Sequence, residues 1–246
     1  MTASLDAKAL SLSGRLQPTD LSLAAGDLAC IVGPNGAGKT SLLHAIAGIG
    51  RPGGSVRVEG KDPTALAPDA RKALLAYLPA SRDLPWPVRA GDVIRLGLPP
   101  RESEDDLRNV LDALELAPLL DRRVDQLSTG ERSRILIARA LAPAPRLLLL
   151  DEPVANLDPY WQLRLMELLR ERARESGCGL LLALHDLDLA ARFADRLIVV
   201  AGGALAADGP PAAVLAGDVI REVFGIERSA GEWRPVRPSA GPRSSR

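Results

Sequence analysis

The stretch that decides the fold runs from residue 28 to residue 40 and reads LACIVGPNGAGKT. Its first five residues, Leu28 to Val32, are apolar and predict a buried strand. The next eight residues, Gly33 to Thr40, follow the pattern GxxxxGK[ST], and a helix with apolar residues on one face is expected after them. A strand, a glycine-rich loop and a helix in this order are the context of a phosphate-binding loop, so the stretch predicts binding of a nucleoside triphosphate.

The chemistry of this loop follows from its residue types. Glycines let successive backbone N–H groups curl around phosphate oxygens, and the N-terminus of the following helix adds a partial positive charge. Lys39 supplies a point charge for the β- and γ-phosphates, and the Thr40 hydroxyl suits Mg²⁺. The residues expected to bind the nucleotide here are Gly33, Pro34, Asn35, Gly36, Ala37, Gly38, Lys39, Thr40 and Ser41.

Two carboxylates follow a second apolar run. Leu147 to Leu150 predict a buried strand, and Asp151 and Glu152 come directly after it. In open α/β sheets, ligands bind at the carboxyl ends of the strands, where these side chains would lie. Asp151 is the candidate ligand of Mg²⁺, and Glu152 is the candidate that orients and polarises an attacking water. A solvated turn could carry the same residues, but the phosphate-binding loop upstream favours the functional interpretation.

Residues 127–131, LSTGE, open another predicted helix about twenty residues before Asp151. The hydroxyl and the free N–H groups of such a helix start could bind a phosphate, although Ser-Thr-Gly alone is an ordinary beginning of a helix. Taken in order, the motifs resemble those of the ATP-binding cassette (ABC) family over roughly residues 24–209. These motifs are the loop at 33–40, LSTGE at 127–131, LLLLDEP at 147–153, Asn156-Leu157-Asp158 and Leu184-His185-Asp186.

The resemblance implies a homodimer in which two subunits pack head to tail around two ATP molecules. Each ATP would lie between the phosphate-binding loop of one subunit and Ser128 and Gly130 of the other, and Asp158 would belong to the interface loop that links the two sites. His185 would contact the γ-phosphate as a switch residue. The cofactors expected are ATP and Mg²⁺, and the catalytic residues expected are Lys39, Glu152 and His185.

Short apolar strands alternate with helices along the chain, which predicts an α/β fold with a mostly parallel, helix-covered sheet. The resemblance implies a P-loop NTPase of the ABC ATPase type, with an antiparallel β edge and an inserted helical subdomain. We expect a single domain over residues 1–246. Its parts would be a catalytic α/β core at 1–79 and 142–228, a helical subdomain with LSTGE at 80–141, and a flexible tail at 229–246. Helices are expected at 69–76, 103–116, 129–141 and 187–193, and a hairpin at 197–207.

Composition excludes several other classes. Lys and Arg together number 31, as do Asp and Glu, so the chain lacks the basic excess that nucleic-acid backbones recruit. The two cysteines, Cys30 and Cys178, lie far apart, which argues against a zinc site or a disulfide framework. Residues 1–10 carry charges and no long apolar run, so no secretory signal is expected. No apolar run reaches the roughly 18 residues of a membrane span.

Two positions depart from the pattern of the family. Most members have a glutamine where this chain has Ala80, and an alanine side chain can neither donate nor accept a hydrogen bond. Our hypothesis is that Ser81 or a water takes its place, with slower or more weakly coupled hydrolysis. Members also often place an aromatic residue before the first strand to stack on adenine, but the first aromatic here is Tyr77, so base selectivity is expected to be loose. His44, in the helix after the loop, is assigned no chemistry.

Residues 88–97, the HDLDLA run at 185–190 and Phe224-Gly225 resemble importer ATPases for ferric siderophores, haem and vitamin B12. The resemblance implies a separate integral-membrane permease, docked in a groove formed by residues 80–98 with Trp86 as a candidate contact. It also implies a periplasmic substrate-binding protein and a peripheral location at the cytoplasmic face of the inner membrane. Two alternatives stay open: a soluble ABC-type ATPase, and a nucleotide-dependent regulator that hydrolyses ATP weakly, which the alanine at position 80 would fit.

Overall fold

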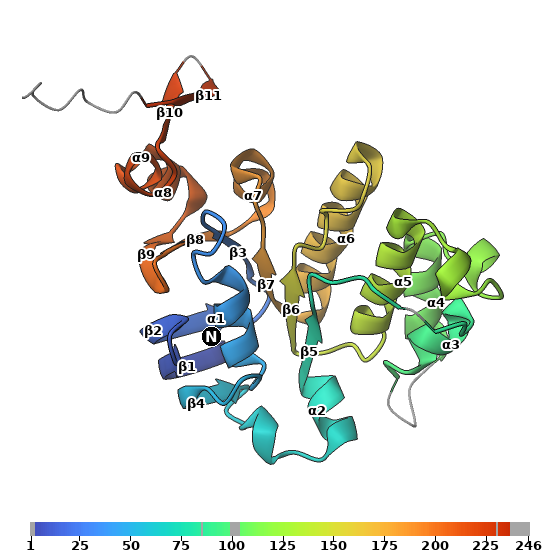
Figure 1. Cartoon of the computed structure of the whole chain (residues 1–246). Helices are drawn as coiled ribbons and strands as arrows, with labels where there is room; N and C mark the ends of the chain where they lie inside the picture. Colours follow the sequence, from blue (N-terminus) through green and yellow to red (C-terminus); the bar gives the residue numbers. More distant parts are fainter. Residues whose placement is uncertain (1–2, 85, 99–103, 230, 237–246) are drawn as a thin grey trace, which may run out of the picture.

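The computed structural model describes residues 3–84, 86–98, 104–229 and 231–236. Its centre is a six-stranded sheet (Figure 1). In spatial order the strands are β5 (Leu75–Leu78), β6 (Leu147–Asp151), β7 (Gly179–Ala183), β3 (Leu28–Val32), β8 (Arg196–Ala201) and β9 (Ala204–Gly209). Neighbouring strands run parallel except β9, which pairs antiparallel with β8. The predicted mostly parallel sheet with an antiparallel edge is therefore confirmed.

Both faces of this sheet are covered, because successive strand residues point to opposite sides. Leu148 and Leu150 belong to one apolar cluster, with residues of α5 (Thr129–Leu141), α6 (Pro159–Ser176) and α7 (Leu187–Phe193). Leu147 and Leu149 belong to the other, with residues of α1 (Lys39–Ile46). Every residue of β3, β6 and β7 is buried as a result, as expected for a parallel sheet between two layers. The second layer also contains an antiparallel sheet of β2 (Leu16–Ala24), β1 (Ala3–Leu12) and β4 (Gly53–Val58).

Helices α3 (Ala90–Arg95), α4 (Glu104–Ala113) and α5 gather beyond the β5 edge of the sheet, on the right of Figure 1. The chain reaches them from the end of β5 and returns into β6. The predicted helices at 129–141 and 187–193 have the observed bounds of α5 and α7. The helix expected at 69–76 is α2 (Pro68–Leu74), which ends early because Leu75 pairs with Leu147 in the sheet. The division into core and helical subdomain at residues 80 and 141 stays a prediction.

The C-terminal part corrects the beginning of the expected flexible tail at 229–246. After α8 (Pro211–Ala216) and α9 (Val219–Phe224), strands β10 (Ile226–Ser229) and β11 (Glu232–Pro235) form an antiparallel hairpin that extends into this segment. Trp233 Nε1 donates a hydrogen bond to Asp188 of α7 at 3.2 Å, and Arg228 forms an ion pair with the same carboxylate at 3.1 Å. Residues 230 and 237–246 lie outside the described residues.

Three short 3₁₀ helices complete the described elements: Pro63–Ala65, Ala117–Leu119 and Val124–Gln126. Among the helices that the structure describes, none is both long enough and apolar enough to span a lipid bilayer.

Candidate active site

The loop between β3 and α1 has the backbone shape that phosphate binding requires. Gly36 and Gly38 have φ angles of 77° and 112°, in the left-handed region that favours glycine. Gly38 is the N-cap of α1, and no side chain caps this helix, so its first N–H groups remain available for a ligand. A side chain at Gly33 would collide with the carbonyl of Val200, which explains why glycine also begins the loop.

Lys39 is folded against this loop. Its side chain is buried, and Nζ donates hydrogen bonds to the carbonyls of Gly33 at 2.7 Å and Pro34 at 3.3 Å. Burial lowers the pKa of Lys39, while the nearby carboxylates of Glu152 and Asp151 favour its charged form and oppose that shift. The loop therefore holds a buried cation against its own carbonyl oxygens, within reach of the acidic end of β6.

Asp151 ends β6 and is only 1% exposed. Burial raises the pKa of Asp151, with the neighbouring Thr40 hydroxyl opposing part of the shift. Within the described part of the chain, neither carboxylate oxygen has a hydrogen-bond partner. A buried carboxylate with two unpartnered oxygens beside a hydroxyl fits Mg²⁺, a hard cation that takes oxygen ligands. The described residues contain no group of three or more His, Cys, Asp or Glu side chains placed to hold a metal.

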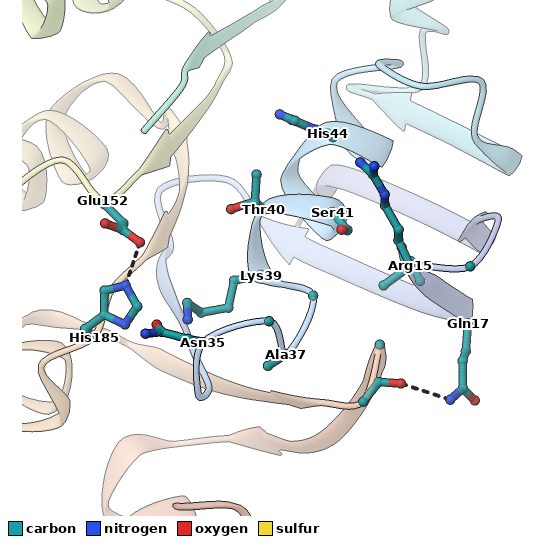
Figure 2. Close-up of a pocket in the computed structure, with 16 residues that line it drawn as sticks. Arg15, Gln17, Asn35, Ala37, Lys39, Thr40, Ser41, His44, Glu152 and His185 are labelled. Carbon is teal, nitrogen blue, oxygen red and sulfur yellow. Dashed lines mark hydrogen bonds and ion pairs between the residues drawn. The ribbon is translucent and has the colours of Figure 1, made fainter. Parts of the chain in front are cut away.

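Glu152 and His185 meet at the carboxyl end of the sheet. Since β6 and β7 are parallel neighbours with Asp151 opposite Ala183, the residues that follow the two strands lie side by side. The Glu152 N–H donates to the carbonyl of Ala183 at 3.1 Å, and Glu152 Oε1 lies 2.5 Å from His185 Nε2. Figure 2 shows this pair facing Lys39 and Thr40. The arrangement places a carboxylate, an imidazole and a lysine around one space.

That space is a cavity of about 670 Å³. It brings together most of the predicted loop residues with Glu152 and His185 (Figure 2). The lining residues are Gly14, Arg15, Leu16, Gln17, Asn35, Gly36, Ala37, Gly38, Lys39, Thr40, Ser41, His44, Glu152, His185, Gly202 and Gly203. Gly33, Pro34 and the buried Asp151 are not part of this lining. A cavity of this size accommodates a ligand of nucleotide dimensions.

The sequence did not predict the wall of the cavity that Arg15 and Gln17 form. Arg15 lies in the turn between β1 and β2, and Gln17 lies near the start of β2. The Gln17 N–H donates to the carbonyl of Gly203 at 2.7 Å, which joins this part of the chain to the β8–β9 hairpin. Glycines in the sequence mark both turns, but no local signal shows that they meet. His44, to which no chemistry was assigned, also lines the cavity, and its ring packs edge-on against Tyr77 with 5.5 Å between centroids.

The structure does not bring Ser128, Gly130 and Asp158 to this cavity. Ser128 is instead the N-cap of α5: its hydroxyl accepts from the Glu131 N–H at 3.2 Å, and the Glu131 carboxylate accepts from the Ser128 N–H at 2.8 Å. Asp158 caps α6 by accepting from the Trp161 N–H at 3.0 Å. Within one subunit these side chains begin helices.

The segment after β5 differs from our hypothesis. Ala80 is exposed, and the Ser81 hydroxyl, also exposed, donates to Asp83 Oδ2 at 3.2 Å, so Ser81 does not turn toward the acidic strand end. The residue that does is Arg82, which is 5% exposed and donates to the backbone carbonyls of Asp151 and Glu152.

Comparisons with known proteins agree with this site. Residues 16–155, more than half of the chain, match the family model described as ABC transporter. The chain is 41% identical over 211 residues to the hemin import ATP-binding protein HmuV of Roseobacter denitrificans, covering 81% of this chain and 80% of that protein. It is 39% identical over 224 residues to the cobalamin import ATP-binding protein BtuD of Halobacterium salinarum, covering 88% of this chain and 56% of that protein.

Solved structures give the same result. An ATP binding subunit of an ABC transporter matches with a TM-score of 0.76 and 26% identity over 90% of this chain and 93% of that one. The cbiO1 protein from Clostridium perfringens, described as part of the ABC transporter complex cbiONQ, matches with a TM-score of 0.73 and 25% identity over 90% of this chain and 94% of that one. The chain therefore belongs to the ABC transporter family.

Proposed function

We propose that two copies of this chain bind two MgATP molecules head to tail, and that hydrolysis in this homodimer drives transport through a separate permease. The triphosphate would lie on the loop residues Asn35 to Ser41, with Lys39 compensating the charge of the β- and γ-phosphates. Ser128 and Gly130 would come from the partner subunit. Two observations support this: Ser128 and Gly130 do not line the cavity of their own subunit, and Ser128 and Thr129 at the start of α5 are exposed.

The contact between Glu152 and His185 carries the hydrolytic part of the proposal. Glu152 would orient the water that attacks the γ-phosphate in line, and His185 would hold the Glu152 carboxylate and contact the γ-phosphate. Asp158 would link the two sites of the dimer. Thr40 and Asp151 would hold Mg²⁺, which when bound neutralises part of the charge on the phosphate oxygens. A regulator with little hydrolysis is less well supported, since it would need no such pair.

The transported solute is the further part of the proposal. The relatives named for hemin and cobalamin import support a metal chelate: haem, vitamin B12 or a ferric siderophore. Trp86 and Leu96, 66% and 68% exposed, are apolar side chains in the segment after β5 and at the end of α3, where the permease would dock. The chain would then work at the cytoplasmic face of the inner membrane, with a periplasmic substrate-binding protein and without nucleic acid.

A Glu152→Gln substitution tests the hydrolytic mechanism. Glutamine keeps the size of the side chain but cannot accept a proton, so turnover should fall at least 100-fold while MgATP still binds. The variant should accumulate a dimer with ATP bound, detected by light scattering. Glu167→Gln, an exposed change on α6, is the matched control and should leave both properties unchanged. Wild-type turnover in Glu152→Gln, or monomers alone in saturating MgATP, would contradict the proposal.

The transport part needs a separate measurement. The chain would be reconstituted in proteoliposomes with its permease, and ATP hydrolysis would be measured with binding protein loaded with haem, cobalamin or a ferric siderophore. Stimulation by one of these solutes supports import of that solute. A chain that never associates with membranes in the cell would instead favour the soluble ABC-type ATPase.

A further inference from the structure

Arg82 is a buried cation beside the catalytic carboxylate. It lies in the segment between β5 and α3, four residues after Leu78, and it is 5% exposed. Arginine is rarely buried without partners, because removing its charge from water is unfavourable unless hydrogen bonds and opposite charges compensate. The partners of this guanidinium therefore indicate what it does.

The two hydrogen bonds of Arg82 enclose the backbone of Glu152. Its Nη2 donates to the carbonyl of Asp151 at 3.0 Å and to the carbonyl of Glu152 at 3.1 Å. These carbonyls belong to the peptide groups on either side of the Glu152 Cα. The φ angle of Glu152 is 51°, in the left-handed region, which a residue with a long side chain adopts only when its surroundings hold it there. One guanidinium nitrogen thus fixes both peptide groups of a strained residue.

The remaining donors of Arg82 face an acidic environment. Nε and Nη1 are buried, and in the described residues they have no hydrogen-bond partner, like both carboxylate oxygens of Asp151. The carboxylates of Asp151 and Glu152 both favour the charged form of Arg82, against the effect of burial, which lowers the pKa of the guanidinium. A fixed positive charge therefore lies next to two adjacent carboxylates that would otherwise repel each other.

We propose that Arg82 is a positioning residue for ATP hydrolysis, because it holds Glu152 in the backbone conformation that directs its carboxylate to His185. The inference rests on the proposed role of Glu152. The inference also accounts for the alanine at position 80. In this segment Arg82, two residues later, reaches the end of β6 and bonds to the backbone on either side of Glu152. Arg82 itself does not line the nucleotide cavity, so it acts through Glu152 and not through ATP.

The alternative is that Arg82 only anchors the segment after β5. Arg82→Met separates the two roles, since methionine fills a similar volume but has no donor and no charge. We expect kcat for ATP hydrolysis by the full chain to fall about 10-fold or more, with KM for ATP within twofold of wild type. Arg82→Lys restores a charge and some hydrogen bonding, and its kcat should lie between those of wild type and Arg82→Met. If Arg82→Met does not fold, Arg82→Lys provides the test: a lower kcat at unchanged KM supports the positioning role, and an unchanged kcat contradicts it.

Arg170 offers a matched control. It also bonds a backbone carbonyl, that of Phe193, and it pairs with Asp195 at 3.0 Å. Asp195 in turn accepts from the N–H of Leu28, the first residue of β3, at the end of that strand away from the phosphate-binding loop. Arg170→Met should therefore lower the melting temperature and leave kcat within twofold of wild type. If Arg82→Met has that same behaviour, Arg82 is only an anchor and the proposal is wrong.

A double-mutant cycle tests whether Arg82 acts through Glu152. In a Glu152→Gln background, where Glu152 no longer orients water, Arg82→Met should change the residual single-turnover rate by less than twofold. Losses that multiply would mean that Arg82 acts independently of Glu152 and would overturn the proposal. The single variant Glu152→Gln distinguishes a failure of the proposed function from a failure of the proposed role of Arg82. If it retains full turnover, the proposed function itself fails; if it is inactive and Arg82→Met is fully active, only the role of Arg82 fails.

Discussion

Asp151 combines burial with an unpartnered charge, and the two together affect both stability and function. Burial raises its pKa, so folding favours the protonated form. The protonated Asp151 carboxyl therefore contributes fully to stability at pH values below its ordinary pKa of 3.8. This contribution is lost as the pH rises through the higher pKa that Asp151 has in the folded protein. At neutral pH the free protein keeps a buried carboxylate with no hydrogen-bond partner among the described residues, although the positive charge of Arg82 favours its ionised form.

Asp151→Asn is expected to stabilise the nucleotide-free protein at pH 7 while it abolishes hydrolysis. The amide has almost the same shape and no charge, so the melting temperature should rise by about 2–4 °C, corresponding to about 1 kcal/mol. The gain should shrink toward pH 4, where the wild-type carboxyl binds a proton. Calorimetry at the two pH values, in EDTA, measures the difference. An equal or lower melting temperature at pH 7 would mean that Asp151 is compensated by other groups.

The N-terminal segment has no aromatic residue that could stack on adenine, but its Arg15 lines the cavity. Figure 2 shows Arg15 among the residues that line the cavity. Its guanidinium is planar and can stack on the face of an aromatic base. We expect Arg15→Ala to raise the KM for ATP and for GTP by similar factors, about 3- to 10-fold from the usual size of cation–π contacts, with kcat unchanged. Steady-state kinetics with both nucleotides measures this.

The control for Arg15 is Arg57→Ala, an exposed change on β4 outside the cavity, which should leave both KM values unchanged. A selective loss of ATP with GTP unaffected would show that Arg15 recognises adenine specifically. That result would contradict the expected loose base selectivity.

At the scale of elements, α5 begins with a reciprocal pair of hydrogen bonds between Ser128 and Glu131. The same serine is proposed to bind the nucleotide of the partner subunit, so stability and hydrolysis depend on one hydroxyl. Aspartate caps a helix as well as serine does, but its negative charge would repel a phosphate. The two requirements can therefore be separated by substitution.

Ser128→Ala should lower the stability by about 1 kcal/mol through loss of the cap and should also impair hydrolysis. Ser128→Asp should keep a melting temperature close to that of wild type and still hydrolyse ATP at least tenfold more slowly. Thermal unfolding and ATPase assays on the same preparations measure both effects. If Ser128→Asp hydrolyses ATP normally, the serine has no role beyond the start of the helix.

At the scale of the whole molecule, the hairpin of β10 and β11 contacts α7, which begins two residues after His185. Trp233 and Arg228 both contact Asp188. These are half-exposed contacts, for which small energies are usual. The hairpin therefore stabilises the outer layer of the fold more than it shapes the site.

A chain that ends at Gly225 should have a melting temperature about 2–4 °C lower, equivalent to about 1 kcal/mol, with kcat and KM within twofold of the full chain. Asp188→Asn in the full chain removes the ion pair with Arg228 and should cause about half of that shift. A large change in kcat after truncation would mean that the hairpin controls the position of His185 through α7.

The sequence alone determined the elements whose signals are local. The apolar runs of β3, β6 and β7 are continuous because both faces of a parallel sheet are buried. Helices α5, α6 and α7 each have a capping side chain just before their first residue. The phosphate-binding loop, Asp151, Glu152 and His185 were recognisable because each lies at the end of a buried strand or just after it. Helices α3, α8 and α9 were missed because each has only six residues, which is too short for a clear apolar period. Strands β1 and β2 were also missed, although buried and exposed residues largely alternate along β2.

Only the tertiary structure decided which residues share the site. Arg15 and Gln17 reach the cavity because an N-terminal turn packs against the β8–β9 hairpin, about 185 residues away in the chain. Arg82 is part of the site because a segment after one strand folds over the end of the next strand in the sheet. The local sequence does not predict these contacts between distant residues, because burial and long-range hydrogen bonds result from the packing of the whole chain. Strands, loops and helix caps, by contrast, depend mainly on neighbouring residues.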